Sequence, residues 1–500
     1  CTRNLMAKNA SLLTIAGHDP SSGAGVSADM AAANALGVPC CSAITALTIQ
    51  NSQGVSAVHP VLPKILQAQV EAILTDMPIA AIKIGMIGSR AMVSRLVHIL
   101  ADVDVPIVLD TVFKASIGED LLATGARQLF ITRLIPMAKL ITPNIPEAEQ
   151  LTGLSINSRE QQLAAAQALL AMGAQAVLLK GGHFDDALAA DVLLERGKPP
   201  LWLMAPQLVS VHSHGSGCVL ASSIAAGLVQ GLSLVSAVVQ AKARVHGGIA
   251  HSQVLGQGVG AVATMGWQPH SDHFPWLHAS DAPVALANPF AAMHQSMGIY
   301  PIVACADELL PLLKAGCRTL QLRVKSADTD LIKQQIERAV AICQDYEDSQ
   351  LFINDHWRLA MQAGAFGVHL GQEDWQALSN ADQALLRNSG LRLGLSTHNL
   401  AEMALAHAAR PTYMAIGPLF GTTSKQIDHP AVGLEKLTDW LRWLSPAYPV
   451  VTIGGIELRD VAAVKACGVD GIAVIGAVKA ATSEQVIAKV EALLAAWHFS

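Results

Sequence analysis

Charged residues are scarce in this 500-residue chain: they make up 14% of it, whereas hydrophobic residues make up 51%. This balance is the reverse of the one that keeps a chain disordered, so large buried cores are expected. Basic residues are also fewer than acidic ones, 33 against 39, which gives a net charge of −6. A chain without a basic excess has no electrostatic footprint for a nucleic-acid backbone. The composition therefore excludes nucleic acid as a partner, and any bound anion is expected to be small.

Cysteine is scarce as well. Eight cysteines, none in CxxC spacing, exclude a disulfide scaffold and the common zinc and redox motifs. The first 17 residues contain no apolar run before a small-residue cleavage site, so no secretory signal is indicated. Two uncharged stretches, 30–63 and 218–241, are interrupted by Asn, Gln, Pro or Gly, whereas a membrane span needs about 20 continuous apolar residues. We expect a cytoplasmic protein with no membrane partner.

Short apolar runs alternate with helical patterns through the first half of the chain. The runs are 12–16, 42–49, 82–86, 107–109, 140–142 and 176–179. This alternation predicts an α/β fold, a mostly parallel sheet with helices on both faces. The stretch 191–205 breaks the rhythm with a glycine and two prolines, and it predicts an antiparallel hairpin at an edge of the sheet.

The periodicity fails between Trp267 and Met297, where four prolines lie among scattered His, Trp and Phe. This predicts a first domain over 1–267, a linker over 268–297 and a second domain over 298–500, each folding alone. In the second domain eight strand-like runs are each followed by a helical pattern. Eight such units in roughly 200 residues predict a (β/α)8 TIM barrel.

Two glycine-rich segments in the first half precede helices. Gly17, Gly23 and Gly25 follow the first strand, where they form either a loop closing over a ligand or a plain tight turn. The segment HGSGC, with Gly215, Gly217 and Cys218, leads into a long apolar helix. Backbone N–H groups at a helix N-terminus form an anion hole, and the helix dipole lowers the pKa of a thiol. Cys218 is therefore predicted to be reactive, with a buried structural cysteine as the alternative.

Three further polar residues follow strands in the first half. Asn144 and Glu147 have i, i+3 spacing, so the carboxylate either holds a hydrated Mg²⁺ beside nucleotide phosphates or forms an N-terminal cap pair. Lys180 precedes two glycines, where it meets phosphate or caps a loop. The histidine pairs His212/His214 and His270/His273 lack a third ligand at fixed spacing and are expected to be ordinary loop residues.

In this order, the segments TIAGHDPSSGAG, ITALTIQN, KIGMI, TPNIPEA, KGGH and HGSGC resemble hydroxymethylpyrimidine/phosphomethylpyrimidine kinase, of the ribokinase-like superfamily, over 12–265. The resemblance implies ATP-dependent phosphorylation of an aminopyrimidine and then of its monophosphate. It places Gly17, Asp29, Gln50 and Met86 around the aminopyrimidine, Asn144, Lys180 and Gly217 at the nucleotide, Glu147 at a metal, and Cys218, Gly215, Gly217 and Lys180 in catalysis.

One departure from the kinase family concerns residues beside the expected site. Thr111 stands where a proline is common, which leaves the roles of Asp110 and Lys114 open. The alternative within the same superfamily is a pyridoxal-type kinase.

In the second half, charged and polar residues follow the predicted strands. They are Gln321, Arg323 and Lys325; Asn354 and Asp355; Gln372 and Asp374; and Ser396. Active sites of TIM barrels lie at this face. Two carboxylates from neighbouring loops can share a Mg²⁺, and an arginine with a lysine can neutralise a diphosphate. The loop GPLFGTTSKQ, with Lys425, is suited to closing over phosphate oxygens, and glycines 454, 455 and 476 offer backbone N–H groups.

These motifs resemble thiamine phosphate synthase over 300–497, a family that joins aminopyrimidine-methyl diphosphate to thiazole phosphate and releases diphosphate. The resemblance implies that Gln321, Arg323, Lys325, Asn354 and Lys425 hold the diphosphate, that Asp355 and Asp374 bind Mg²⁺, that the catalytic Ser396 lies near the leaving group, and that Thr422, Ser424, Gly455, Ile475 and Gly476 contact substrate. Gly421 replaces a frequent proline and Gly476 a frequent serine.

The two resemblances together predict a bifunctional enzyme of thiamine biosynthesis whose first half makes the diphosphate that its second half consumes. Its partners are small molecules: the aminopyrimidine, its phosphates, thiazole phosphate and ATP, with Mg²⁺ as cofactor. The alternative is an active kinase with a non-catalytic or thiazole-aromatase-like barrel. The sequence leaves the oligomeric state open, a homo-oligomer included.

Overall fold

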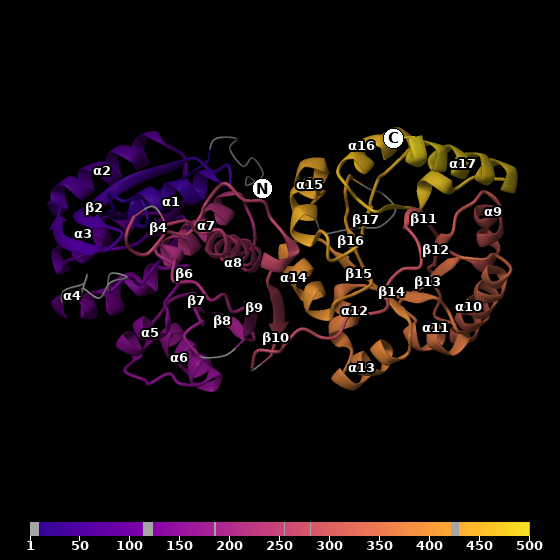
Figure 1. Ribbon diagram of the computed structural model, residues 1–500, viewed down its shortest axis with the longest axis horizontal. Helices are drawn as coiled ribbons and strands as arrows, with labels where there is room; N and C mark the ends of the chain where they lie inside the picture. Colours follow the sequence, from indigo (N-terminus) through magenta and orange to yellow (C-terminus); the bar gives the residue numbers. More distant parts are fainter. Residues whose placement is uncertain are drawn as a thin grey trace. The chain divides into compact units, whose positions relative to one another are not determined.

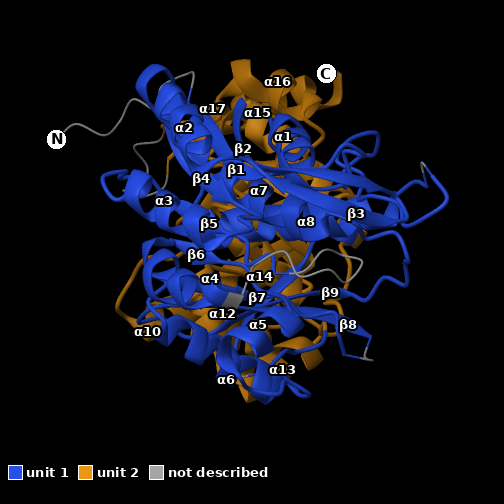
Figure 2. Ribbon diagram, turned by 90° about the vertical axis from the view of Figure 1, so that its left-hand side faces the viewer, with its two compact units in different colours: residues 1–269, 273–285 blue, residues 270–272, 286–500 orange. Residues whose placement is uncertain are grey.

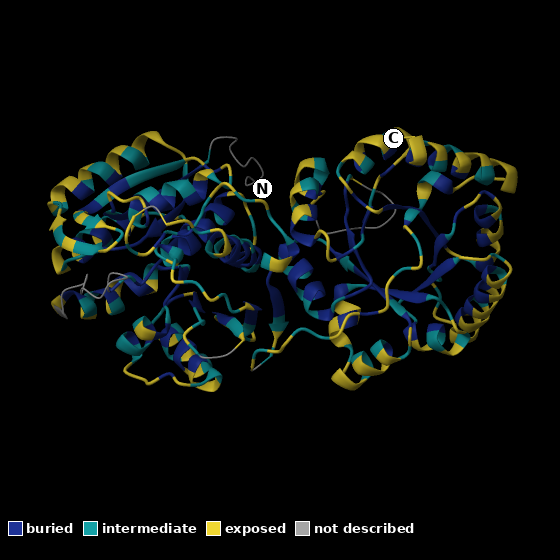
Figure 3. Cartoon of the chain, viewed as in Figure 1, coloured by how far each residue is buried: buried dark blue, intermediate teal, exposed yellow. Residues whose placement is uncertain are grey.

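The computed structural model describes residues 10–113, 124–184, 187–254, 256–280, 282–421 and 430–499. The chain divides into two compact units (Figure 2). The first comprises Cys1–Pro269 and His273–Ala285, and the second comprises His270–Asp272 and Leu286–Ser500. In each unit the central strands are buried while the outward faces of the helices are exposed (Figure 3).

The first unit is built on a ten-stranded sheet, counted over the described residues, in the order β10-β9-β8-β7-β6-β5-β4-β1-β2-β3 (Figure 1). Its strands are β1 (Ser11–His18), β2 (Cys40–Asn51), β3 (Gly54–Pro60), β4 (Ile79–Ile84), β5 (Ile107–Leu109), β6 (Leu140–Ile141), β7 (Ala176–Leu179), β8 (Leu188–Glu195), β9 (Leu201–Pro206) and β10 (Trp276–Ala279). The neighbouring strands β7-β6-β5-β4-β1-β2 are parallel to one another. Strand β3 at one end, and β8, β9 and β10 at the other, each pair antiparallel with their neighbours.

The helices of the first unit are α1 (Gly25–Asn34), α2 (Pro63–Asp76), α3 (Arg90–Leu100), α4 (Thr124–Leu129), α5 (Ile145–Thr152), α6 (Arg159–Ala171), α7 (Ser216–Val229) and α8 (Leu234–Ala250). They form separate groups: α7 packs against α1 and α8, while α3 packs against α2 and α4, and α5 against α6. Strand β1 is buried over nearly its whole length, as expected for a strand covered on both faces. The prediction of a mostly parallel sheet with helices on both faces is confirmed.

The second unit is a closed barrel in which β11 pairs with both β12 and β18, so that the described sheet has no edge. Its strands, all parallel, are β11 (Gly298–Val303), β12 (Thr319–Leu322), β13 (Gln350–Asn354), β14 (Gly367–Leu370), β15 (Arg392–Thr397), β16 (Tyr413–Ile416), β17 (Val450–Ile453) and β18 (Gly471–Val474). Around it lie α9 (Leu309–Lys314), α10 (Thr329–Gln344), α11 (Trp357–Ala363), α12 (Gln372–Ala377), α13 (Asn380–Asn388), α14 (Leu400–Ala409), α15 (Gly433–Leu444), α16 (Val461–Ala466) and α17 (Ser483–Phe499). The TIM barrel prediction is confirmed.

The segment expected to be a linker belongs largely to the two units. Strand β10 pairs antiparallel with β9, so the predicted hairpin is present but does not form the edge of the sheet. Trp276 and Leu277 of β10 are only 3% and 1% exposed. Further on, Phe290 N donates to Arg410 O and Thr412 Oγ1 donates to Ala291 O, so this part is bound to the barrel. A four-residue strand between prolines is too short to produce a periodic pattern.

We therefore place the boundary between the units near residue 285, and we predict that fragments 1–285 and 286–500 each fold. A fragment ending at residue 268 loses β10 and the buried side chains of Phe274, Trp276 and Leu277. Loss of one such side chain from a core destabilises by about 3 kcal/mol. Urea denaturation should therefore give fragment 1–268 a free energy of unfolding lower than that of 1–285 by at least this amount. Equal stabilities would show that β10 contributes nothing to the first unit.

Candidate active sites

A cavity of about 850 Å³ opens in the first unit at the carboxyl ends of the parallel strands. Residues following β1, β4, β5, β6 and β7 line it together with the N-terminus of α7. Ligand sites of open α/β sheets lie at this edge. The cavity brings together nearly all of the site residues predicted in this half: Gly17, Gln50, Met86, Asn144, Glu147, Lys180, Gly215, Gly217 and Cys218.

The two glycine-rich segments approach each other backbone to backbone at this cavity. Gly215 has φ +78°, and a Cβ atom there would lie 1.9 Å from the carbonyl oxygen of Gly23. Gly25 has φ +60°, and a Cβ atom there would lie 2.2 Å from the carbonyl oxygen of Gly17. Only glycine fits at either position. The glycines therefore set the wall of the cavity and the start of α7.

A charged pair faces the first turn of α7. Lys180 Nζ lies 3.5 Å from Asp110 Oδ1, and this oxygen also accepts a hydrogen bond from Thr142 Oγ1 at 3.0 Å. A Cβ atom on Gly217 would lie 3.3 Å from Lys180 Nζ, so the lysine reaches the helix N-terminus. An ammonium group and free N–H groups at one point form a site for a phosphate-sized anion.

The Cys218 thiol lines the cavity, but its pKa is shifted in the direction opposite to the prediction. Burial raises the pKa of Cys218 to about 11, which outweighs the lowering effect of the nearby Lys83 ammonium. The charge of Lys83 is itself paired with Asp29, so it offsets little of the burial effect. The prediction of a lowered pKa was wrong: without ligands, Cys218 is a protonated thiol at neutral pH.

Asp29 is not among the residues that line the cavity, so its contact with the aminopyrimidine stays a prediction. It is 0% exposed within α1, and both carboxylate oxygens lie 2.8 Å from Lys83 Nζ. Thr14 Oγ1 and Ser222 Oγ donate to the same carboxylate, each at 2.6 Å. The face of α1 that carries Asp29 turns toward β1, β4 and α7, so this carboxylate joins four elements beneath the cavity.

Asp19 and His214 meet Gln50 in the cavity wall. His214 Nε2 lies 3.2 Å from Asp19 Oδ2 and 3.2 Å from Gln50 Nε2. Burial acts to raise the pKa of Asp19, but hydrogen bonds from His214 and Ser21 outweigh it and the pKa is lowered. His214, which was expected to be an ordinary loop residue, is thus a hydrogen-bonded part of the cavity wall. The sequence indicates Asp19 and His214 only through their positions: Asp19 lies inside the first glycine-rich segment, and His214 directly precedes Gly215 of the second.

Asn144 and Glu147 form a capping box at the start of α5: Glu147 N donates to Asn144 Oδ1, and Asn144 N donates to Glu147 Oε2. Thr111 Oγ1 donates to the same Glu147 oxygen at 3.0 Å. Burial and the neighbouring Asp110 raise the pKa of Glu147, although Lys180 acts to lower it. Two carboxylates that repel each other beside a phosphate site are a donor set that suits Mg²⁺.

A second cavity, of about 1520 Å³, opens at the carboxyl ends of the barrel strands. It is lined by the described site residues predicted for this half: Gln321, Arg323, Lys325, Asn354, Asp355, Asp374, Ser396, Gly455, Ile475 and Gly476. The predictions for Lys114, Thr422, Ser424 and Lys425 concern residues outside the described part of the chain.

Two aspartates, Asp355 and Asp374, line the second cavity, and their positions are set by the local backbone. Asp355 has φ +67°, a left-handed conformation that is strained for a non-glycine residue, and its Oδ2 lies 3.7 Å from Lys325 Nζ. Asp374 is in the first turn of α12. Across the described ranges, no group of three or more His, Cys, Asp or Glu side chains could hold a metal ion. Two carboxylates fit Mg²⁺, which commonly takes one or two of them and completes its shell with phosphates and water.

Glycines on the opposite side of this cavity allow two loops to touch. Gly455 has φ +65°, and a Cβ atom there would lie 2.5 Å from the carbonyl oxygen of Gly421. Among the described residues, no atom lies within 4 Å of such a Cβ at Gly421 or Gly476. The two departures from the family pattern therefore leave open space rather than a distorted wall.

Comparison with known proteins gives a family for each of the two units. Residues 19–263 match the phosphomethylpyrimidine kinase family, and residues 299–478 match the thiamine monophosphate synthase family. The chain is 32% identical over 479 residues, 93% of its length and 89% of the relative's, to the chloroplastic thiamine biosynthetic bifunctional enzyme TH1 of Arabidopsis thaliana. The chain belongs to the bifunctional thiamine biosynthetic enzymes.

Each half of this bifunctional enzyme also has separate relatives. The first half is 41% identical to a hydroxymethylpyrimidine/phosphomethylpyrimidine kinase of Streptomyces coelicolor, over 51% of this chain and 94% of that one. The second is 45% identical to a thiamine-phosphate synthase of Neisseria meningitidis, over 41% and 98%. The chain therefore has kinase and thiamine-phosphate synthase activities. No helix in the described part of the chain is long and apolar enough to cross a membrane.

The different positions of Asp29 and Gln50 predict different defects. Asp29→Asn leaves the Lys83 ammonium buried without an opposite charge, which should lower the free energy of unfolding by about 3–5 kcal/mol. Gln50→Ala removes a polar group from the cavity wall and should raise the KM for the aminopyrimidine without comparable destabilisation. Urea denaturation and kinase kinetics on both variants separate the two. If Asp29→Asn leaves the free energy of unfolding unchanged but raises the KM for the aminopyrimidine, Asp29 contacts the substrate.

Proposed function

We propose that ATP and the aminopyrimidine bind in the first cavity, that Mg²⁺ accompanies the nucleotide, and that the pyrimidine diphosphate formed there is the substrate of the second cavity. One observation carries this proposal: each unit has, at its strand ends, a cavity in which a lysine lies beside two carboxylates. The lysines are Lys180 in the first cavity and Lys325 in the second. The described cysteines are free thiols, which supports a reducing compartment such as the cytoplasm.

In the kinase step, the substrate hydroxyl attacks the terminal phosphorus of ATP, the bond from that phosphorus to the bridging oxygen breaks so that ADP leaves, and the hydroxyl proton passes to solvent. In a second round, a phosphate oxygen of the monophosphate attacks another ATP in the same way and gives the diphosphate. Gln50, Gly17 and Met86 hold the pyrimidine so that its hydroxyl faces the N-terminus of α7. The N–H groups around Gly217, together with Lys180, stabilise the charge on the transferring group. Asp110 and Glu147 would hold Mg²⁺, which supplies charge neutralisation for the phosphates.

The protonation state of Cys218 decides between its two proposed roles. A thiol whose pKa is about 11 is a poor base at neutral pH, but it can donate a hydrogen bond. We therefore assign Cys218 the role of a donor to the transferring phosphoryl group, beside the helix N–H groups.

Replacing Cys218 tests this role. Cys218→Ala removes the donor and should lower the kinase kcat by about 100-fold, the scale of one lost oxyanion donor. Cys218→Ser keeps a donor and should retain most of the activity. The matched control is Cys41→Ala, a partly exposed cysteine of β2 outside the cavity, which should match the parent. Equal loss in the Ala and Ser variants would indicate that Cys218 acts as a base.

In the coupling step, the bond between the exocyclic methylene carbon and the diphosphate oxygen breaks, and its electron pair leaves with the diphosphate. The 4-amino group of the pyrimidine donates electron density to the carbon, and the lone pair of the thiazole nitrogen then forms the new C–N bond. Gln321, Arg323, Lys325 and Asn354 stabilise the departing diphosphate, while the glycines at 455 and 476 receive the thiazole phosphate. Asp355 and Asp374 would hold Mg²⁺ against the same diphosphate.

Removing one carboxylate tests the metal assignment. Asp374→Asn should raise the Mg²⁺ concentration needed for half-maximal coupling by about tenfold or more, because a neutral ligand binds the cation less strongly. The kinase step should keep its Mg²⁺ dependence. Asp439→Asn, which removes an exposed carboxylate paired with Arg442, is the control. A titration of Asp374→Asn that overlays the parent curve would reject the assignment.

The sequence alone left one alternative, a kinase, pyridoxal-type or not, whose barrel is non-catalytic or acts as a thiazole aromatase. The described diphosphate and metal residues of the barrel disfavour it, because they all line one cavity. Coupling of supplied pyrimidine diphosphate with thiazole phosphate by the purified chain would exclude this alternative.

A further inference from the structure

Five polar side chains from five strands form a continuous hydrogen-bonded chain across the interior of the barrel. Gln321 Nε2 of β12 donates to the Tyr300 hydroxyl of β11 at 2.9 Å, and this hydroxyl lies 2.9 Å from the Tyr413 hydroxyl of β16. Tyr413 lies 2.8 Å from His369 Nδ1 of β14, and His369 Nε2 lies 2.8 Å from Ser396 Oγ of β15. The chain begins and ends at residues that line the second cavity.

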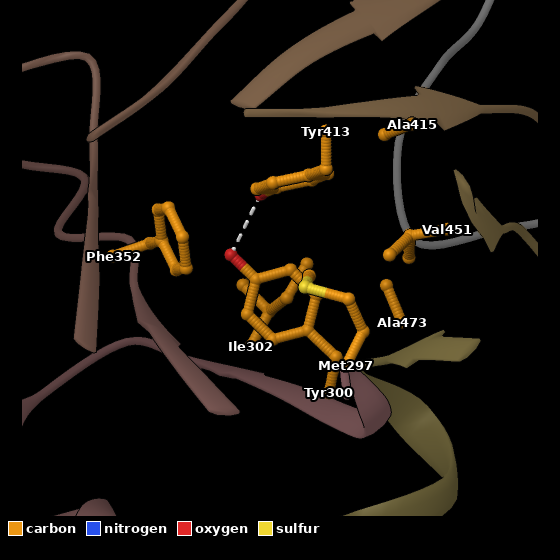
Figure 4. Packing of buried hydrophobic residues seen from close by; sticks show 8 residues of the cluster. All are labelled: Met297, Tyr300, Ile302, Phe352, Tyr413, Ala415, Val451 and Ala473. Atoms are coloured by element: carbon orange, nitrogen blue, oxygen red, sulfur yellow. Dashed lines mark hydrogen bonds between the residues drawn. The ribbon is translucent and has the colours of Figure 1, made fainter. Parts of the chain in front are cut away.

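The middle of this chain lies in an apolar environment. Tyr300 and Tyr413 are 1% and 0% exposed and belong to a cluster with Met297, Ile302 and Phe352. In Figure 4 their hydroxyl groups point toward each other, with the ring of Phe352 beside them. A buried hydroxyl without a partner destabilises by about 1–3 kcal/mol. The two tyrosine hydroxyl groups avoid this cost because each has hydrogen-bond partners in the series.

The hydrogen bonds in this series run in one direction, from donor to acceptor. Tyr300 accepts from Gln321, so its own proton has Tyr413 as the acceptor that the described structure provides. Because Tyr413 accepts from Tyr300, we assign its own proton to the bond with His369 Nδ1. The imidazole has no acidic group among its hydrogen-bond partners, so it is neutral, and with Nδ1 as the acceptor it carries its proton on Nε2. That N–H donates to Ser396 Oγ.

We propose that this chain, referred to below as the donor relay, fixes the Ser396 hydroxyl as a hydrogen-bond donor directed into the cavity. Since Ser396 Oγ accepts from His369, its own proton is free to point toward an oxygen of the departing diphosphate. Tyr300, Tyr413 and His369 are then positioning residues for the coupling reaction. Such a preorganised donor acts most strongly where charge develops, in the transition state.

Interrupting the relay at its centre should affect turnover. Tyr413→Phe preserves the ring but removes the proton that fixes His369, so the Ser396 hydroxyl can donate to His369 instead of to the substrate. We expect the coupling kcat to fall by about tenfold, corresponding to about 1.4 kcal/mol of transition-state stabilisation, with the KM for pyrimidine diphosphate nearly unchanged. Tyr300→Phe should give a smaller fall, because the Tyr413 to His369 bond survives.

The decisive measurement is a double-mutant cycle with Ser396→Ala. If the relay acts through Ser396, then adding Tyr413→Phe to Ser396→Ala should cause no further loss of kcat. Multiplicative losses in the double variant would overturn the proposal, as would a Tyr413→Phe variant with the parent's kcat.

A matched control is present in the same barrel. His407 Nδ1 and the Tyr448 hydroxyl form a buried pair of the same type, 2.8 Å apart, and neither residue lines the cavity. Tyr448→Phe should keep the parent's kcat. An equal fall in both variants would show that loss of any buried tyrosine–histidine bond is enough, and would reject the relay. The proposal rests on the coupling activity of the barrel: an inactive parent chain would reject that activity, whereas multiplicative losses in an active chain would reject the relay alone.

Discussion

The buried ion pair between Asp29 and Lys83 is the interaction on which the kinase unit depends. It joins α1 to β4, and through Thr14 and Ser222 it also holds β1 and α7. Breaking a buried pair leaves an uncompensated charge, so these four elements have one arrangement in which all partners are satisfied. That arrangement sets the N-terminus of α7 and hence Gly217 and Cys218. Burial keeps Cys218 protonated, and Asp29 adds to this effect because it opposes the lowering of the thiol pKa by Lys83.

In the barrel, the buried polar groups that need partners are uncharged. Its interior holds two tyrosine hydroxyls and an imidazole, and each of them is satisfied by a neighbour from another strand. In both units, then, buried polar contacts beneath the cavity fix the groups at its surface. In our proposal, polar side chains at the strand ends supply the chemistry, and the buried contacts beneath them set their orientation.

Much of the fold could be predicted because strand and helix patterns are local. The strands β5 and β7 coincide with the predicted runs, since each is a short apolar segment between turns. The site was predictable where glycine or charge follows a strand, as at Gly215 and Asp374. What escaped prediction depends on tertiary packing: which side Asp29 faces, how far Cys218 is buried, the pairing of β10 with β9, and the convergence of Tyr300, Tyr413 and His369 from three strands.

The central claim is that one chain makes a pyrimidine diphosphate and then consumes it. The most direct measurement is a ³¹P NMR time course of the intact protein with ATP, Mg²⁺, hydroxymethylpyrimidine and thiazole phosphate. We predict successive signals of the pyrimidine monophosphate and diphosphate, followed by thiamine phosphate and free diphosphate as the intermediate declines. Accumulation of the pyrimidine diphosphate without thiamine phosphate, or the absence of any pyrimidine phosphate, would contradict the account.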